Sequence, residues 1–222
     1  MSCPRPCVIF DFDGTLADSV DGIVVAVNDS LARFGYPTRD PSDITDHMGR
    51  GLRSLYTWAT GIDDLEALRP VVDATRIRYH EVWRDHTVIF PGIPALLSDL
   101  RARGAALGVL SNKGHDSTVE VAEGLFPPGT FDSVHGIAED WPGKPHPQGL
   151  LRMVEDLASA PSHALMVGDM SVDIRVGRAA GIRTIGVTWG FQGIAAFRED
   201  PPDLLASTPA GILDHFESAL NG

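Results

Sequence analysis

Residues 8–15, which read Val-Ile-Phe-Asp-Phe-Asp-Gly-Thr, constrain this chain more than any other stretch. The apolar run from Val8 to Phe10 predicts a short buried strand of a parallel sheet. Asp11 and Asp13 follow, and side chains two residues apart on an extended chain point to the same side. We therefore expect both carboxylates in one pocket at the C-terminal end of the strand, the edge where open α/β sheets bind ligands.

Two carboxylates that converge in this way repel each other, and they are tolerable together only with a proton or a cation between them. Gly14 permits a tight turn that brings backbone close to a ligand. The Thr15 hydroxyl is a small donor for an anion. A plain strand-end turn, in which Asp and Gly are common, is the alternative for this stretch alone. The pattern favours a functional site.

Composition restricts the class of protein. The chain has 222 residues, of which 43% are hydrophobic and 22% charged, and this is ordinary for a globular protein with a sizeable core. The formal net charge of −12 disfavours nucleic acid and anionic membrane surfaces as partners. It would also repel an anionic substrate, so a phosphate site must create its own local positive field. The sequence does not define an oligomeric state.

Cys3 and Cys7 are too few for a four-thiolate zinc site, and a bridge between them would close only a very small loop. We expect two free thiols, as in a reducing cytosol. The N-terminus lacks the apolar segment of a signal peptide, and no apolar run has the length of a membrane span. These features predict a soluble, cytoplasmic protein.

Apolar spacing predicts strands that alternate with helices, which implies an α/β fold with a doubly wound parallel sheet. Ser19 is a possible N-cap, Gly181 is a natural C-cap, and residues 37–46 are polar and rich in turn formers. The predicted helices are 20–34, 50–59, 64–84, 93–102, 115–124, 147–158 and 172–180. The predicted strands are 8–10, 106–110, 132–136, 164–167 and 183–187, with a final strand–helix pair near 203–219.

The separation of the first two predicted strands defines the domain organisation. Far more chain lies between them than a crossover needs, and it shows helical periodicity only. We infer an inserted helical domain over residues 17–88. The α/β core would then comprise residues 1–16 and 89–222, and the chain would cross between the two parts near residues 16–19 and 86–91.

Polar residues follow the later strands of the predicted sheet. Ser111 ends the second strand, Lys144 comes after the third, and Asp169 and Asp173 follow the fourth. Parallel strands place their C-terminal ends on one edge, so these side chains can meet Asp11 and Asp13. Gathered carboxylates suggest a hard divalent cation, and Mg²⁺ suits a phosphate site. Taken singly, Lys144 could be a solvated lysine and the later aspartates could be turn or helix-start residues.

Four segments resemble the haloacid dehalogenase superfamily, and most of all its phosphoglycolate phosphatase-like branch. They are Asp11-Phe12-Asp13-Gly14-Thr15, Ser111-Asn112-Lys113, Lys144-Pro145 and Gly168-Asp169-Met170-Ser171-Val172-Asp173. Ala180-Gly181 and Val187-Thr188-Trp189-Gly190 also look like that branch. The helical insert is similar to the family's cap in position, but its sequence match is weak.

The resemblance implies a mechanism and a set of site residues. Asp11 would attack phosphorus and form an aspartyl-phosphate, and Asp13 would protonate the leaving oxygen and later activate water. Mg²⁺ would lie on Asp11, on the Asp13 backbone carbonyl and on Asp169, with Asp173 ligating the ion or holding water. Lys144 would offset the charge of Asp11 and of the phosphate. The implied phosphate-binding residues are Thr15, Ser111, Asn112 and Lys144.

The resemblance predicts a Mg²⁺-dependent phosphatase for a small phosphorylated metabolite such as phosphoglycolate. A phosphomutase of the same superfamily would use the same Asp pair. Two further alternatives are a phosphoaspartate signalling receiver and a catalytically silent phosphate-binding protein. A carboxylate at position 13 argues against dehalogenase chemistry, because halide leaves without a proton. His47, Arg50 and Arg53 could reach the leaving group, although a solvated helix start explains them equally well.

Overall fold

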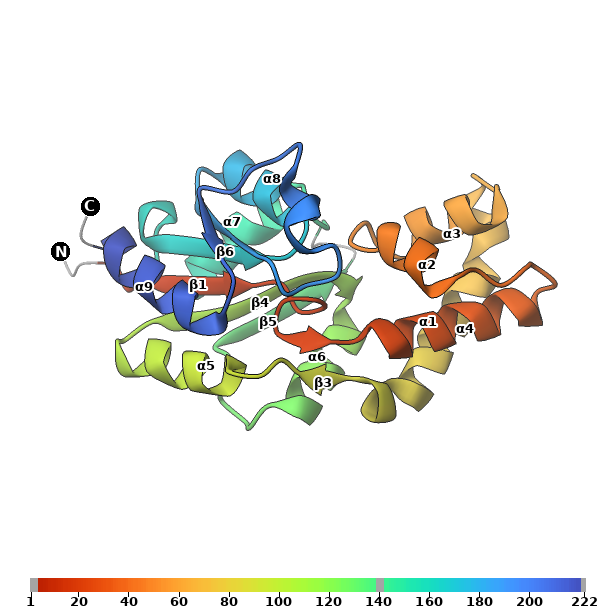
Figure 1. Ribbon diagram of the computed structural model, residues 1–222, viewed down its shortest axis with the longest axis horizontal. Helices are drawn as coiled ribbons and strands as arrows, with labels where there is room; N and C mark the ends of the chain where they lie inside the picture. The colour runs from red at the N-terminus through yellow and green to blue at the C-terminus, as the bar shows by residue number, and fades with distance from the viewer. Residues whose placement is uncertain (1–3, 139–141, 221–222) are drawn as a thin grey trace.

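A six-stranded parallel sheet forms the centre of the molecule, with the strand order β5-β4-β1-β6-β7-β8 (Figure 1). The computed structural model describes residues 4–138 and 142–220. The strands are β1 (Cys7–Phe10), β4 (Ala106–Gly114), β5 (Ser133–Ile137), β6 (Ala164–Gly168), β7 (Arg183–Val187) and β8 (Leu204–Ala206). The predicted α/β class with a doubly wound parallel sheet is confirmed.

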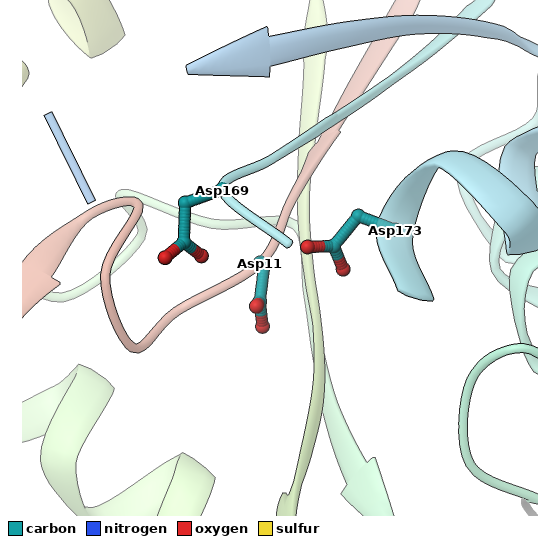
Figure 2. Close-up of side chains that lie close together, drawn as sticks. All are labelled: Asp11, Asp169 and Asp173. Atoms are coloured by element: carbon teal, nitrogen blue, oxygen red, sulfur yellow. The ribbon is translucent and has the colours of Figure 1, made fainter. Parts of the chain in front are cut away.

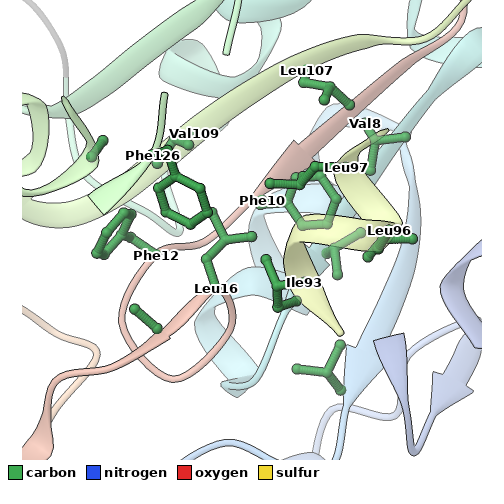
Figure 3. Close-up of a cluster of buried hydrophobic side chains, with 14 of the residues drawn as sticks. Val8, Phe10, Phe12, Leu16, Ile93, Leu96, Leu97, Leu107, Val109 and Phe126 are labelled. Atoms are coloured by element: carbon green, nitrogen blue, oxygen red, sulfur yellow. The ribbon is translucent and has the colours of Figure 1, made fainter. Parts of the chain in front are cut away.

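Strand β1 is buried on both faces because helices cover both sides of the sheet. Val8 and Phe10 pack with residues of α5, α6 and α9 on one face (Figure 3). Cys7 and Ile9, which alternate with them, pack with α7 and α8 on the other. The covering helices are α5 (Ile93–Ala102), α6 (His115–Leu125), α7 (Pro147–Asp156), α8 (Ser171–Ala180) and α9 (Pro209–Leu220). A strand enclosed in this way places its C-terminal end, and therefore Asp11, with little positional freedom.

Residues 17–88, called the helical insert below, extend beyond one edge of the sheet layer and lie at the right of Figure 1. They have an apolar cluster of their own, built around Leu31, Tyr56 and Leu68. The insert contains α1 (Val20–Arg33), α2 (Pro41–Asp46), α3 (Leu52–Thr60) and α4 (Leu65–His86). Two-residue strands, β2 (Ala17–Asp18) and β3 (Val88–Ile89), pair antiparallel where the chain enters and leaves it.

The second half of α4 belongs to both parts of the molecule. Tyr79 and Trp83 are buried in the large cluster of the α/β core. The Trp83 indole donates a 3.0 Å hydrogen bond to Glu120 on α6. A Cβ built on Gly124 of α6 would lie 2.3 Å from the Trp83 ring, so only glycine allows this approach. The insert is therefore packed against the core in this structure.

Several local predictions are wrong. Residues 37–46 include helix α2, which Pro41 begins at its first turn. The insert is not purely helical, since β2 and β3 lie at its ends. Ser19 occupies the predicted N-cap position of α1, but its hydroxyl donates to Asp13 and accepts no hydrogen bond from a backbone N–H of the helix. Strand β4 continues to Gly114 instead of ending at residue 110, which extends the backbone through the polar residues that follow.

Of the two cysteines, Cys7 is a free thiol whose burial raises its pKa. Cys3 lies outside the described residues. Across the part of the chain that the structure describes, the helices are too short or too polar to cross a bilayer.

Candidate active site

Three buried carboxylates meet at the C-terminal edge of the sheet (Figure 2). Asp11 directly follows β1, Asp169 directly follows β6, and Asp173 lies in the first turn of α8. One carboxylate oxygen from each lies within 4.8 Å of the others. The predicted meeting of Asp11 with Asp169 and Asp173 is therefore present in the structure, because neighbouring parallel strands bring their ends together.

Glycines provide the space that these carboxylates occupy. A Cβ on Gly14 would lie 2.3 Å from Asp169 Oδ2, and Gly14 also has a φ of +83°, which disfavours other residues. A Cβ on Gly168 would lie 2.2 Å from the Asp173 carboxyl carbon, and one on Gly190 would lie 2.3 Å from Asp169 Cβ. The backbone is thus shaped around the acidic groups.

Lys144 provides the positive charge of this cluster. Its ammonium lies 2.8 Å from Asp11 Oδ1 and 2.6 Å from Asp173 Oδ1, and it is buried. Burial by itself would lower the pKa of Lys144, but the two carboxylates raise it above its ordinary value. The sequence could not distinguish this residue from a solvated lysine, and the structure places it beside Asp11, its predicted partner, and also beside Asp173.

The carboxylates carry more negative charge than Lys144 can offset. Burial raises the pKa of Asp11 to about 7; Lys144 opposes this shift and the charge of Asp173 adds to it. Burial also raises the pKa of Asp169 well above its ordinary value, and the charges of Asp11 and Asp173 contribute. Two like charges 4 Å apart repel by about 4 kcal/mol at an effective dielectric constant of about 20. The three carboxylates offer the oxygen ligands that a divalent cation prefers, and the single ammonium leaves negative charge for that cation to offset.

Asp13 is separate from this cluster, because its carboxylate belongs to a second ionic group. Asp13 Oδ1 accepts hydrogen bonds from Ser19 Oγ at 2.6 Å and from Lys113 Nζ at 2.7 Å. Lys113 also donates to the Tyr79 hydroxyl at 2.9 Å. Burial by itself would lower the pKa of Lys113, but Asp13 and Tyr79 together, through charge and hydrogen bonds, raise it above its ordinary value. Asp13 therefore faces the same cavity as Asp11 with a different cationic partner.

Lys113 is part of the Ser111-Asn112-Lys113 motif, but no role was predicted for it. Strand β4 runs on to Gly114, but its pairing with β5 shifts register between Leu110 and Gly114. Ser111, Asn112 and Lys113 all line the cavity between the sheet and the insert. Strand periodicity therefore does not identify Lys113, and its position directly after Ser111-Asn112 at the end of a strand is the signal that the sequence offers.

The predicted phosphate-binding residues differ in where they lie. Ser111 and Asn112 line the cavity between the sheet and the helical insert, and Ser111 is buried. Thr15 is fully buried, and its hydroxyl donates to Asp169 Oδ1 at 3.2 Å. The Asn112 side chain bonds to the backbone of Gly49 and Lys144. Thr15 and Asn112 thus hold other site residues, and a direct contact with phosphate stays a prediction for both.

A cavity of about 420 Å³ lies between this edge of the sheet and the helical insert, with Asp11 and Asp13 in its wall. Arg50, Arg53 and Arg76 of the insert also line it, so positive charge faces the acidic cluster. His47 does not line it. Its ring stacks on Trp58 at 3.8 Å, and its Nδ1 contacts the Asp43 carbonyl. The structure therefore places the two predicted arginines at the cavity and His47 away from it.

Comparisons with known proteins agree with this architecture. Residues 8–187 match the haloacid dehalogenase-like hydrolase family. Phosphoglycolate phosphatase of Aquifex aeolicus is 32% identical over 214 residues, which cover 93% of this chain and 94% of the relative. Phosphoglycolate phosphatase of Escherichia coli strain K12 is 30% identical over 237 residues, covering 95% and 94%. A solved haloacid dehalogenase-like hydrolase from Bacteroides fragilis is 31% identical, with a TM-score of 0.87 and coverage of 94% and 99%.

The chain belongs to the haloacid dehalogenase-like hydrolase family, as the four motifs predicted. This match over residues 8–187 favours the hydrolase family over a signalling receiver domain, which was one of the alternatives.

Proposed function

We propose that this protein is a Mg²⁺-dependent phosphatase that hydrolyses a small phosphorylated metabolite through an aspartyl-phosphate. The observation that carries the proposal is the placement of the Asp11 carboxylate. It lies at a cavity wall, paired with Lys144 and next to two further buried carboxylates. The broader class follows from the family and from relatives that span almost the whole chain: the protein is a phosphoric monoester hydrolase.

In the first step, Asp11 attacks phosphorus and the bond to the leaving oxygen breaks. Asp13, held by Ser19 and Lys113, donates its proton to that oxygen, which leaves as an alcohol. Lys144 offsets charge on Asp11 and on the phosphoryl group. Mg²⁺, held by Asp11, Asp169 and Asp173, would supply further positive charge to the phosphoryl oxygens.

In the second step, Asp13 takes a proton from water, and the water oxygen attacks the phosphorus of the aspartyl-phosphate. The bond between phosphorus and Asp11 breaks, which releases inorganic phosphate and restores the carboxylate. Asp13 is again protonated and ready for the next substrate.

The substrate proposal rests on the arginines and on the relatives. Phosphoglycolate carries a carboxylate on its leaving group, and two relatives are named phosphoglycolate phosphatases. Arg50 and Arg53 of the insert line the same cavity as Asp11 and Asp13, which makes them candidates for binding a second anionic group of the substrate. We propose that residues 17–88 act as a cap that selects the leaving group, and that residues 1–16 and 89–222 perform the chemistry.

The direct test is a screen of phosphorylated metabolites with the purified protein, read out as inorganic phosphate. Repeated release of phosphate, lost with EDTA and restored by Mg²⁺, supports the proposal. A single stoichiometric labelling of the protein without turnover would contradict it. Transfer of phosphate within a sugar phosphate, without release, would support a phosphomutase instead.

Mg²⁺ is expected to stabilise the protein more at pH 7.5 than at pH 5. The raised pKa of Asp11 means that the folded, metal-free protein binds more protons than the unfolded chain between pH 3.8 and about 7. Its stability therefore falls as pH rises through this interval. Mg²⁺ replaces those protons. At 100 times its dissociation constant it adds about 2.7 kcal/mol, or roughly 5–10 °C in Tm.

Thermal unfolding followed by circular dichroism measures this shift. Asp169→Asn should remove it, whereas Asp63→Asn, which alters an exposed carboxylate of the insert, should retain it. Equal Mg²⁺ shifts at both pH values would show that the buried cluster is not the binding site.

Arg50→Ala is expected to lower kcat/KM for phosphoglycolate by roughly 10- to 150-fold and to change it much less for an aryl phosphate. Hydrogen bonds to charged groups contribute about 1.5–3 kcal/mol, and an aryl leaving group carries no carboxylate. The measurement is the ratio of kcat/KM for the two substrates. His47→Ala is the matched control, because His47 lies in the same segment but faces Trp58. If both variants change the ratio equally, Arg50 has no specific role in recognition.

A further inference from the structure

Asn112 on β4 connects two segments that are distant in sequence. Its Nδ2 donates to the Gly49 carbonyl of the helical insert at 2.8 Å and to the Lys144 carbonyl at 2.9 Å. Its Oδ1 accepts from the Lys144 backbone amide at 2.7 Å. The Asn112 side-chain amide thus forms one hydrogen bond to the insert and two to the backbone of Lys144, one to its carbonyl and one from its N–H.

The insert segment that meets Asn112 packs closely against the core. Gly49 and Gly51 have φ values of +85° and +82°, which glycine adopts without strain. A Cβ on Gly49 would lie 3.0 Å from the end of Met170, and one on Gly51 would lie 3.6 Å from the Asn112 carbonyl. On the other side, a Cβ on Gly143 would lie 2.8 Å from Asn112 Oδ1. Backbone from the insert and from the Lys144 segment therefore both approach this one side chain.

Lys144 is the ammonium that pairs with Asp11 and Asp173. Its backbone position determines where its buried side chain can reach. In an arrangement with the insert away from the core, Asn112 Nδ2 would keep only the Lys144 carbonyl as a partner. With one restraint fewer, the side-chain amide would hold the Lys144 backbone less firmly.

We propose that Asn112 is a positioning residue that couples closure of the helical insert to the placement of Lys144 in the active site. The inference rests on the proposed function, since it assigns Lys144 a part in phosphate hydrolysis. Lys113, the next residue, has a parallel arrangement: it joins Tyr79 of the insert to Asp13. Full charge compensation at Asp11 is then reached only while the insert covers the cavity, which restricts attack to the closed state.

The test uses Asn112→Ala and Asn112→Asp in the full-length protein. The alanine variant removes all three hydrogen bonds without adding charge. The aspartate variant keeps the shape and the Oδ1 acceptor but replaces the donor with an oxygen that faces two carbonyls. Gln192→Ala is the matched control, because Gln192 Nε2 also donates from the core to an insert carbonyl, that of Asp46, at 3.4 Å.

Amide hydrogen exchange is measured with Mg²⁺ and inorganic phosphate present. Both Asn112 variants should raise exchange in residues 47–53 and also in residues 144–150. Gln192→Ala should affect at most the first segment. For an active wild type, kcat on phosphoglycolate should fall 10- to 100-fold in the Asn112 variants, the range usual for residues that orient a functional side chain, with a smaller change in KM.

If residues 144–150 exchange amide hydrogens as slowly in both Asn112 variants as in the wild type, the inference is overturned. This holds even if the wild type is an active phosphatase. Raised exchange in both segments, together with a wild type that releases no phosphate from any ester, would leave the coupling standing and reject the proposed function. A fall in kcat without any change in exchange would place Asn112 in direct contact with phosphate, as the sequence predicted, and would also reject the coupling.

Discussion

Replacing Asp11 by asparagine is expected to abolish turnover and to leave the fold intact. An amide cannot attack phosphorus, and loss of a nucleophile costs on the order of 10⁴- to 10⁶-fold in kcat in comparable enzymes. The asparagine oxygen can still accept the 2.7 Å hydrogen bond from the Phe12 amide. Lys144 keeps Asp173 as its partner. The carboxylate is therefore needed for the reaction rather than for folding.

The measurement is kcat on an aryl phosphate, with thermal unfolding to check the fold. Acid quenching after brief exposure to labelled substrate should trap phosphate on the wild-type protein and none on Asp11→Asn. Turnover near the wild-type rate in a variant of confirmed mass would exclude a covalent intermediate on Asp11.

Asp13→Asn is expected to lower kcat by about 10²- to 10⁴-fold, as usual for a general acid–base group. The loss should be greater for an alkyl phosphate than for a nitrophenyl phosphate, because the nitrophenolate leaves without needing a proton. Hydrolysis of the aspartyl-phosphate should also slow, since Asp13 activates water in the second step. Labelled protein should therefore accumulate in this variant.

Ser19→Ala is the control for this experiment. It removes the 2.6 Å hydrogen bond to Asp13 but leaves the carboxylate and its pairing with Lys113. Its effect on kcat should be at most several-fold. If Asp13→Asn loses the same factor on both substrates and no label accumulates, Asp13 does not transfer the proton.

Together, these two variants separate the two ionic groups of the site. Asp11 belongs to the cluster with Lys144, and Asp13 belongs to the group with Lys113. Each carboxylate has its own ammonium partner, buried Lys144 for Asp11 and partly buried Lys113 for Asp13, so one can act as nucleophile and the other as acid and base. The resemblance implied two roles for Asp13, namely proton transfer and metal binding. Its carboxylate lies outside the acidic cluster, and metal binding through its backbone carbonyl stays a prediction.

The fold class and the place of the acidic cluster could be predicted from the sequence alone. The apolar run Val8–Phe10 predicted a buried strand, and the structure has β1 over Cys7–Phe10 with helices covering both faces. The meeting of Asp11, Asp169 and Asp173 followed from one rule, that parallel strands end at the same edge. Both inferences rest on local periodicity and on sheet geometry. A short stretch of sequence is enough to recognise each of them.

The partner of each polar side chain could not be predicted and became known from the three-dimensional structure. Thr15 donates to Asp169, Lys113 pairs with Asp13, and Asn112 joins Gly49 to Lys144. Likewise, Arg50 lines the cavity while His47, three residues earlier, stacks on Trp58. Thr15 and Lys113 meet partners elsewhere in the core, His47 meets a partner within the insert, and Asn112 meets Gly49 because the insert packs on the core. Local spacing gives the direction of a side chain from its own backbone, but packing between distant segments determines what it meets.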